Sequence, residues 1–177
     1  MSFKVTIFVL FLIFSLNFAK FHLRVKKIEC FGSNKTVVNY NCYTKAYNRR
    51  SPVFNIELVF KRKTENLKLS TTHHHRIDDK NSYRQILHIE NIEICKIIKG
   101  SETSAFLKQT VDWMKSVLKD YDHLCKTLGQ IKFLNSSVPD SEFLKWFPSG
   151  QYLSGFKYFD EIDSDVINLN FSFVMNK

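Results

Sequence analysis

Three adjacent histidines, His73, His74 and His75, are the most conspicuous potential metal ligands in the chain. Successive side chains of a β-strand point to opposite faces, so a strand would place only His73 and His75 together. Structural and catalytic zinc sites use at least three protein ligands, and no Asp or Glu stands at a supporting spacing around this run. We therefore expect the histidines to lie on a surface edge strand, and we predict no metal site.

Fragments of other functional motifs are present, but each is incomplete. Ser116 and Lys119 match the spacing of S-x-x-K, but the companion S-D-N and K-T-G motifs are missing. His88-Ile89-Glu90 matches the first half of a zinc-deaminase signature without the P-C-x-x-C that completes it. The acidic run Asp160–Asp165 lacks the glycine and spacing of a calcium loop, so we interpret it as a solvated turn. The sequence therefore predicts a non-enzymatic protein with no cofactor.

The four cysteines are Cys30, Cys42, Cys95 and Cys125, and no two of them form a C-x-x-C pair. In an exported chain an even number of cysteines indicates disulfides, and four cysteines permit three connectivities. We favour Cys30–Cys42, which is symmetric about a predicted turn near Thr36. The second bond would then be Cys95–Cys125, which would tie a predicted helix to the strand before it.

Residues 1–19 have the features of a secretory signal peptide. Lys4 precedes an almost wholly apolar run from Val5 to Leu16, and Ala19 is a small residue at the expected cleavage position. The uninterrupted apolar run is shorter than the ~20 residues that span a bilayer, so a cleaved signal is favoured over an anchor. We therefore predict a secreted, extracellular protein with a single domain over residues 20–177.

Potential glycosylation sites agree with export. The three N-x-S/T sequons begin at Asn34, Asn135 and Asn170. The formal net charge of +9 would suit anionic lipid or glycan surfaces, although solubility of a phenylalanine-rich chain is the simpler explanation. The positive charges are scattered, which argues against a nucleic-acid partner.

Alternating apolar and polar residues predict about eight β-strands. The clearest alternation runs from Phe54 to Phe60 and from Ile167 to Phe173. The apolar phase shifts near Glu90-Asn91, which predicts a β-bulge there. The other expected strands are Phe21–Cys30, Val38–Ala46, Leu67–Thr72, Arg84–Ile94, Gln130–Leu134 and Gly150–Phe159.

One long helix is expected between the last two cysteines. From Ser101, a potential N-cap, to Leu124 the apolar residues recur with a helical period, and Trp113 and Leu118 lie on the apolar face. The expected fold class is therefore mainly β: an antiparallel β-sandwich with one long amphipathic helix.

The loop from Ser136 to Ser149 is unusually apolar and contains Phe143, Trp146 and Phe147. Such a loop either caps the core or lines the mouth of a cavity. The 17 phenylalanines of the chain likewise need a large apolar interior or an apolar ligand.

The order of several short segments resembles a large insect family of small secreted proteins of unknown function. That family is similar to the ML (lipid-recognition) domains and includes chemosensory proteins of gustatory hairs. The segments that carry the resemblance are Lys27-Ile28-Glu29-Cys30, Ile92-Glu93-Ile94-Cys95-Lys96, His123-Leu124-Cys125 and Phe147-Pro148-Ser149-Gly150-Gln151-Tyr152.

The resemblance implies an immunoglobulin-like β-sandwich whose two sheets can part to hold an apolar ligand. We therefore expect a secreted binding protein for a lipid or hydrocarbon, with a role in chemosensation and with a membrane receptor as a partner. The alternative is a protein-interaction module with a filled core and no small-molecule ligand. The residues expected to line the cavity or form its lid are Phe54, Ile56, Leu58, Phe60, Phe143, Trp146, Phe147, Phe156 and Phe171.

Overall fold

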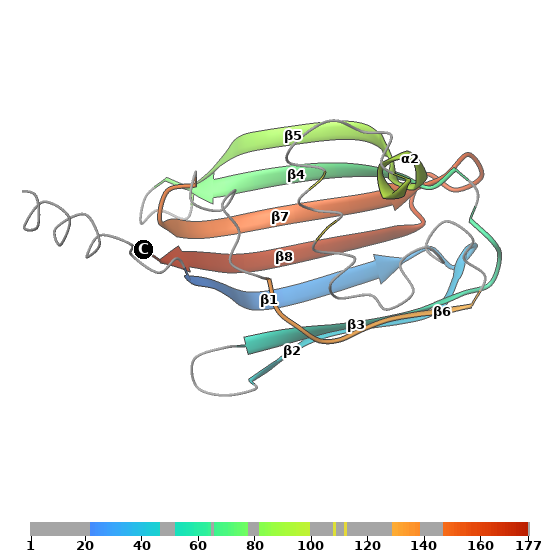
Figure 1. The fold of residues 1–177 in the computed structure, drawn as a ribbon, viewed down its shortest axis with the longest axis horizontal. Helices are drawn as coiled ribbons and strands as arrows, with labels where there is room; N and C mark the ends of the chain where they lie inside the picture. The colour runs from blue at the N-terminus through green and yellow to red at the C-terminus, as the bar shows by residue number, and fades with distance from the viewer. Residues whose placement is uncertain are drawn as a thin grey trace, which may run out of the picture.

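The computed structural model describes residues 22–46, 52–64, 66–77, 82–99, 108, 112, 129–138 and 147–176. These residues form eight β-strands and the short α-helix α2 (Figure 1). The first four strands are β1 His22–Gly32, β2 Val37–Ala46, β3 Pro52–Phe60 and β4 Lys68–Arg76. They are followed by β5 Tyr83–Glu93, α2 Ile94–Ile98, β6 Gln130–Ser136, β7 Gly150–Phe159 and β8 Ile167–Asn176.

The strands form two antiparallel sheets. The five-stranded sheet has the order β1-β8-β7-β4-β5, and the three-stranded sheet has the order β2-β3-β6. In Figure 1, β1 is the strand of the larger sheet that runs beside the smaller sheet. The mainly β, antiparallel part of the predicted fold is therefore confirmed.

The apolar core takes residues from both sheets. On β3, Phe54, Ile56, Leu58 and Phe60 are all buried, as the alternation predicts. On β8, the buried side chains Ile167, Leu169 and Met175 lie on one face, and Leu169 belongs to the same cluster as the β3 residues. A period of two is therefore sufficient to identify the inward faces of these two strands.

The bulge predicted in β5 is confirmed. Leu69 of β4 pairs with Ile92, whereas Thr71 pairs with Ile89, so β5 has one extra residue between these pairs. Asn91 at this point has a φ of 56°, a left-handed conformation that asparagine tolerates better than most residues. The apolar phase of β5 shifts because the bulge turns the following side chains to the other face.

The long helix is the incorrect part of the fold prediction. The helical element of the described residues is α2, which has five residues and begins at Ile94, where a strand was expected. Ile94 and Ile97 are both buried, and a helical turn presents residues three apart to the same side of the core. Residues 101–124 lie almost wholly outside the described residues. No helix of the described chain is long and apolar enough to cross a membrane.

A buried polar network joins three loops at one end of the sheets. Arg62, which follows β3, donates from Nη2 to Thr36 Oγ1 and to Asp160 Oδ1, each at 3.0 Å. Thr36 in turn donates to Asp163 Oδ2 at 2.8 Å. Asp160 and Asp163 are buried, so the interpretation of the whole acidic run as a solvated turn is wrong. The cause is Arg62, a partner 98 residues away in sequence from Asp160.

The predicted Cys30–Cys42 disulfide is present and connects β1 to β2, with Cα atoms 5.8 Å apart. These strands are the neighbouring edges of the two sheets, so the bond ties the sheets together. Cys95 is also disulfide-bonded. Its predicted partner, Cys125, lies outside the described residues, so that pairing stays a prediction.

Removal of the Cys30–Cys42 bond is expected to destabilise the fold by about 3 kcal/mol, because the open chain regains the entropy of a loop of this length. The measurement is urea unfolding of a Cys30→Ser/Cys42→Ser protein against the wild type without reductant. A loss below about 1 kcal/mol would show that other contacts already hold the two sheets together.

Candidate functional site

β4 carries His73 and His75 into the interior of the fold. The strand pairs with β7 on one side and with β5 on the other. Thr71, His73 and His75 share the face of β4 that also holds the buried Leu69. The expectation of a surface edge strand is therefore wrong, because both neighbouring strands come from later in the sequence. No group of three or more His, Cys, Asp or Glu within the described ranges could hold a metal ion.

Two hydroxyl groups hold the ring of His73. Nδ1 lies 2.6 Å from Ser154 Oγ of β7, and Nε2 lies 3.0 Å from Thr71 Oγ1. The ring meets that of Phe156 edge to face, with centroids 5.6 Å apart. Removal from water, with a smaller effect from the neighbouring His74, lowers the pKa of His73 to about 4. The imidazole is therefore neutral at neutral pH.

The His73–Ser154 pair has the spacing of a general base and a nucleophile, but its surroundings do not suit catalysis. A general base is most effective when its pKa lies near the operating pH, and the pKa of His73 is well below that range. The second ring nitrogen contacts the Thr71 hydroxyl, where a catalytic triad would place a carboxylate. We interpret the pair as a structural hydrogen bond.

The lowered pKa of His73 makes stability depend on pH. A histidine in the unfolded chain takes up a proton near pH 6.5, whereas folded His73 does so only near pH 4. Between these two pH values the unfolded state binds more protons than the folded state. The free energy of unfolding therefore falls as the pH is lowered. We expect protonation of this residue to lower the free energy of unfolding by up to about 3 kcal/mol over this pH range.

A His73→Gln variant should lack this part of the pH dependence, because glutamine does not titrate. The measurement is denaturant unfolding at about pH 7 and about pH 4.5. Asn39→Gln, at an exposed position of β2, introduces a glutamine without removing a titratable group; it is the control and should retain the wild-type dependence. If the free energy of unfolding of His73→Gln depended on pH as strongly as that of the wild type, the pH dependence would come from other titratable groups.

Some of the predicted ligand-binding residues meet between the sheets. Phe54 of β3 contacts Phe171 of β8, and Phe171 contacts Phe156 of β7, with 5.5 Å between ring centroids in both pairs. Phe54 has no exposed surface, whereas Phe156 and Phe171 are only partly buried. The other predicted residues buried in this cluster are Ile56, Leu58 and Phe60.

Phe147 belongs to a second cluster, centred on Tyr152. The two rings lie 6.0 Å apart, and Tyr152 stacks on Phe173 at 5.3 Å. His75 lies against the same tyrosine, at 4.7 Å. The structure thus separates Phe147 from the Phe54 cluster. The remaining predicted lid residues, Phe143 and Trp146, lie outside the described residues.

The polar side chains of this inner face are missing from the sequence-based prediction. A signal was present, because a period of two from Leu69 reaches Thr71, His73 and His75. Gly150 also has a structural role here: its φ is 151°, and a Cβ atom on it would lie 2.5 Å from His75 Nε2. Glycine is therefore required for the close approach of β7 to this histidine.

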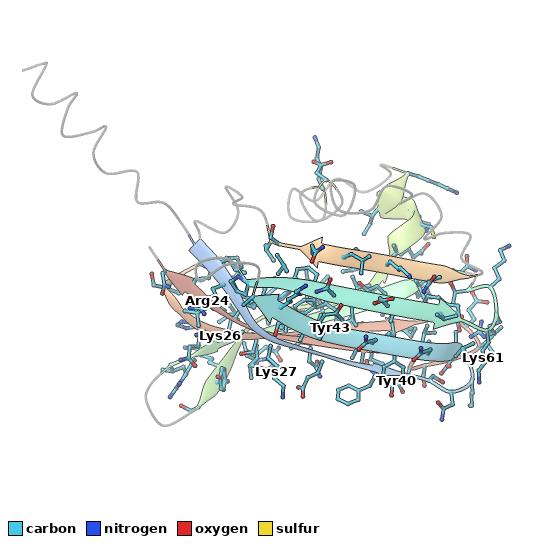
Figure 2. All side chains as sticks on the ribbon, turned by 90° about the horizontal axis from the view of Figure 1, so that it is seen from below. Arg24, Lys26, Lys27, Tyr40, Tyr43 and Lys61 are labelled. Atoms are coloured by element: carbon cyan, nitrogen blue, oxygen red, sulfur yellow. A yellow bond between two sulfur atoms is a disulfide. The ribbon has the colours of Figure 1, made fainter. Side chains whose placement is uncertain are left out.

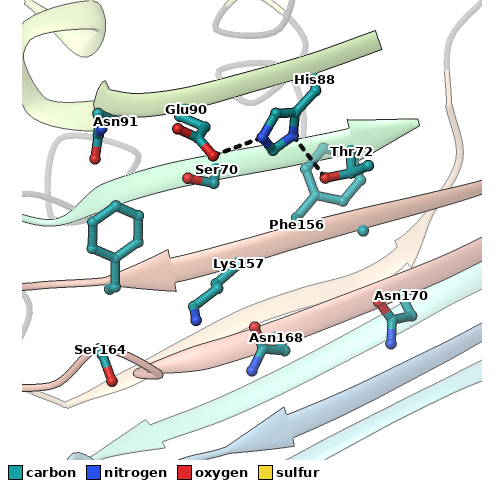
Figure 3. A pocket seen from close by; sticks show the side chains of 12 residues that line it. Ser70, Thr72, His88, Glu90, Asn91, Phe156, Lys157, Ser164, Asn168 and Asn170 are labelled. Carbon is teal, nitrogen blue, oxygen red and sulfur yellow. Dashed lines mark hydrogen bonds and ion pairs between the residues drawn. The ribbon is translucent and has the colours of Figure 1, made fainter. Parts of the chain in front are cut away.

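The opposite, outer face of the five-stranded sheet carries a shallow pocket of about 460 Å³, lined by polar side chains and by Phe156 and Phe159 (Figure 3). Within it, His88 Nε2 lies 2.7 Å from Glu90 Oε1, and His88 Nδ1 lies 3.0 Å from Thr72 Oγ1. Lys157, on its rim, pairs with Asp165 at 2.8 Å. The other polar residues of the pocket used below are Ser70, Asn168 and Asn170.

A basic and aromatic surface lies along the edge strands β1 and β2. Phe31 is 53% exposed, and Tyr40 and Tyr43 are each 40% exposed. Figure 2 shows the basic residues of β1 and the tyrosines of β2 from this side of the molecule. The exposed basic residues labelled there are Arg24, Lys26, Lys27 and Lys61.

All three predicted glycosylation sites are exposed. Asn34 lies in the turn between β1 and β2. Asn135 has a φ of 51°, and its backbone N–H donates to Asn55 Oδ1 at 2.9 Å. Asn170 lies on the outer face of β8, in the polar pocket. Attachment of glycans at these positions stays a prediction.

No protein-family model matches the chain. No curated protein matches it. A solved structure described as "Crystal structure of a Niemann-Pick type C2 protein from Japanese carpenter ant" is similar over 85% of this chain and 89% of that chain, with 8% identity and a TM-score of 0.31. A TM-score this low does not establish a shared fold, so membership of the insect family stays a prediction.

Proposed function

We propose that this chain is a secreted, non-enzymatic protein that binds an apolar small molecule, such as a lipid or hydrocarbon. The observation that carries the proposal is the set of rings on the inner face of the larger sheet, Phe156, Phe171 and Phe173, which remain partly accessible. Phe54, at the centre of the core, is buried completely, whereas these three residues are not. Their accessible surface is therefore available to an apolar ligand.

Polar groups at fixed positions support the same proposal. Small-molecule pockets are mostly apolar and contain a few polar groups that orient the ligand. His73 is one such group beside Phe156, and the buried hydroxyls of Thr71 and Ser154 fix the position of its ring. His73 is uncharged at neutral pH and offers no positive charge to a carboxylate. This inner face therefore favours a hydrocarbon, ester or alcohol over a fatty-acid anion.

Secretion is part of the proposal. The Cys30–Cys42 disulfide supports it, because such bonds persist in oxidising compartments. The signal peptide expected over residues 1–19 lies outside the described residues. Under the proposal, residues 20–177 form one ML-like domain, and chemosensory delivery to a membrane receptor is its specific role.

The test is mass spectrometry of an organic extract from the purified protein. The chain is expressed with its own leader in insect cells and purified without detergent. We expect a stoichiometric lipid or hydrocarbon in the extract. An empty extract, together with no response to an uncharged fluorescent apolar probe such as N-phenyl-1-naphthylamine, would contradict the proposal.

A second candidate function is a secreted protein-interaction module. The exposed aromatic and basic surface of β1 and β2 favours it, because Tyr, Phe and Arg are enriched in protein interfaces. A ligand-free extract, combined with weaker partner capture after Tyr40→Ala and Tyr43→Ala, would support this candidate. Ligand in the extract and unchanged capture would support the first.

A further inference from the structure

The rows of side chains on the outer face of the five-stranded sheet are interrupted at Gly155. Strand pairing places Asn170, Gly155, Thr72 and His88 in one row that crosses β8, β7, β4 and β5. Neighbouring strands lie about 4.8 Å apart, so the row spans roughly 14 Å. Because Gly155 has no side chain, the backbone of β7 forms the floor of a groove between Asn170 and Thr72.

Side chains of β7 stand on both sides of this gap. Lys157 and Leu153, two residues to either side of Gly155, are exposed on the outer face. A Cβ atom built on Gly155 would lie 3.4 Å from Asn170 Oδ1, so the amide of Asn170 is directly beside the gap. In Figure 3, Asn170 and Thr72 lie on strands at opposite sides of β7.

The charged groups around the groove are paired with one another. Glu90 lies 2.7 Å from His88, and Lys157 pairs with Asp165 at 2.8 Å. Lys157 is therefore neutralised by Asp165, and the carboxylate of Glu90 is hydrogen-bonded to His88, so neither charge is free to select an ion. Hydroxyl and amide groups, such as those of Thr72 and Asn168, can both donate and accept hydrogen bonds. The groove therefore suits a neutral ligand rich in hydroxyl groups, which is a carbohydrate.

We propose that an N-linked glycan on Asn170 lies in this groove, with its first sugars over Gly155 and its next contacts at Thr72 and His88. Asn170-Phe171-Ser172 is a sequon, and Asn170 is exposed. The inference depends on export, which is part of the proposed function, and is independent of the apolar ligand.

The attachment step uses a lipid diphosphate oligosaccharide as its donor. A bond forms between Asn170 Nδ2 and the anomeric carbon of the first sugar, and the bond between that carbon and the phosphate breaks. The amide proton leaves together with the released lipid diphosphate. The glycan is thereby tethered at one end of the groove, so it can occupy the groove without the entropic cost of free association.

The experiment combines glycopeptide mass spectrometry with hydroxyl-radical footprinting of the full chain secreted from insect cells. We expect Asn170 to carry a glycan, and we expect most of the radical labelling of His88 to be lost relative to Asn170→Gln protein. Tyr40, exposed on the other sheet, is the internal reference and should be labelled equally in both proteins. Ser172→Ala, which removes the sequon without changing Asn170, should reproduce the Asn170→Gln result.

Gly155→Val tests the groove itself. The valine side chain should displace the glycan and restore labelling of His88 while Asn170 stays occupied. Equal labelling of His88 with and without the glycan would overturn the inference, as would an unmodified Asn170 beside a modified Asn34. Failure of the chain to appear in the culture medium, by contrast, would contradict export and with it the proposed function.

Discussion

Replacement of Arg62 with alanine is expected to lower the free energy of unfolding by about 3 kcal/mol, the lower end of the range for breaking a buried ion pair. Only 1% of the Asp160 side chain is exposed, against 23% for Arg62. Oδ2 of Asp160 lies 2.8 Å from Arg62 Nη1. The two atoms form an ion pair, but their geometry is not that of a hydrogen bond. Without the guanidinium group, this carboxylate would stay buried without its cation, and Thr36 would lose a donor.

The effect of Arg62→Ala should depend on pH in a defined direction. Desolvation alone would raise the pKa of Asp160, but hydrogen bonds from Arg62 and from the amides of Asp163 and Ile162 outweigh it and lower that pKa. A carboxylate with a lowered pKa stabilises the fold above its ordinary pKa and loses this effect as the pH falls through the lowered value. The difference between wild type and variant should therefore shrink below about pH 4.

Urea unfolding at neutral pH and at acid pH measures both effects. Arg24→Ala, at an exposed position of β1, is the matched control and should change stability by less than about 0.5 kcal/mol. If Arg62→Ala lowered the free energy of unfolding as little as Arg24→Ala, the Arg62–Asp160 pair would have the energy of a solvent-exposed ion pair.

The alternation of apolar and polar residues predicted the features that depend on neighbouring residues within one strand. The alternation of β3 and β8 identifies their inward faces, and the phase shift at Glu90-Asn91 identifies the bulge. Whether a strand is central or at an edge depends on its neighbours. The histidine run was placed on an edge because β7, which covers one side of β4, lies about 80 residues further along the chain.

The same limit applies to the candidate site. The sequence identified Phe54, Phe156 and Phe171, which do meet between the sheets. It could not identify the His73–Ser154 hydrogen bond, whose partners are 81 residues apart. Alternation also cannot distinguish a ring that fills a core from a ring that lines a cavity, because both point inward. That distinction depends on how much of each ring stays accessible.

Phe54→Ala and Phe156→Ala are expected to separate these two roles. Phe54 is fully buried, so its truncation should cost about 3–5 kcal/mol of unfolding free energy through lost burial and the cavity left behind. Phe156 keeps accessible surface, so its truncation should cost less stability. If Phe156 lines the ligand site, the same truncation should weaken ligand binding.

Binding is measured with an uncharged fluorescent apolar probe such as N-phenyl-1-naphthylamine, and stability by urea unfolding of the same samples. Under the proposed function, Phe156→Ala lowers the free energy of probe binding by more than it lowers the free energy of unfolding. The reason is that a ligand replaces water on the exposed part of the ring. Phe31→Ala, on the exposed surface of β1, is the matched control and should change neither quantity. An equal loss of stability in Phe54→Ala and Phe156→Ala, with unchanged probe affinity, would make both rings core residues. The interior would then be filled, and the basic and aromatic surface of β1 and β2 would become the place to search for a partner.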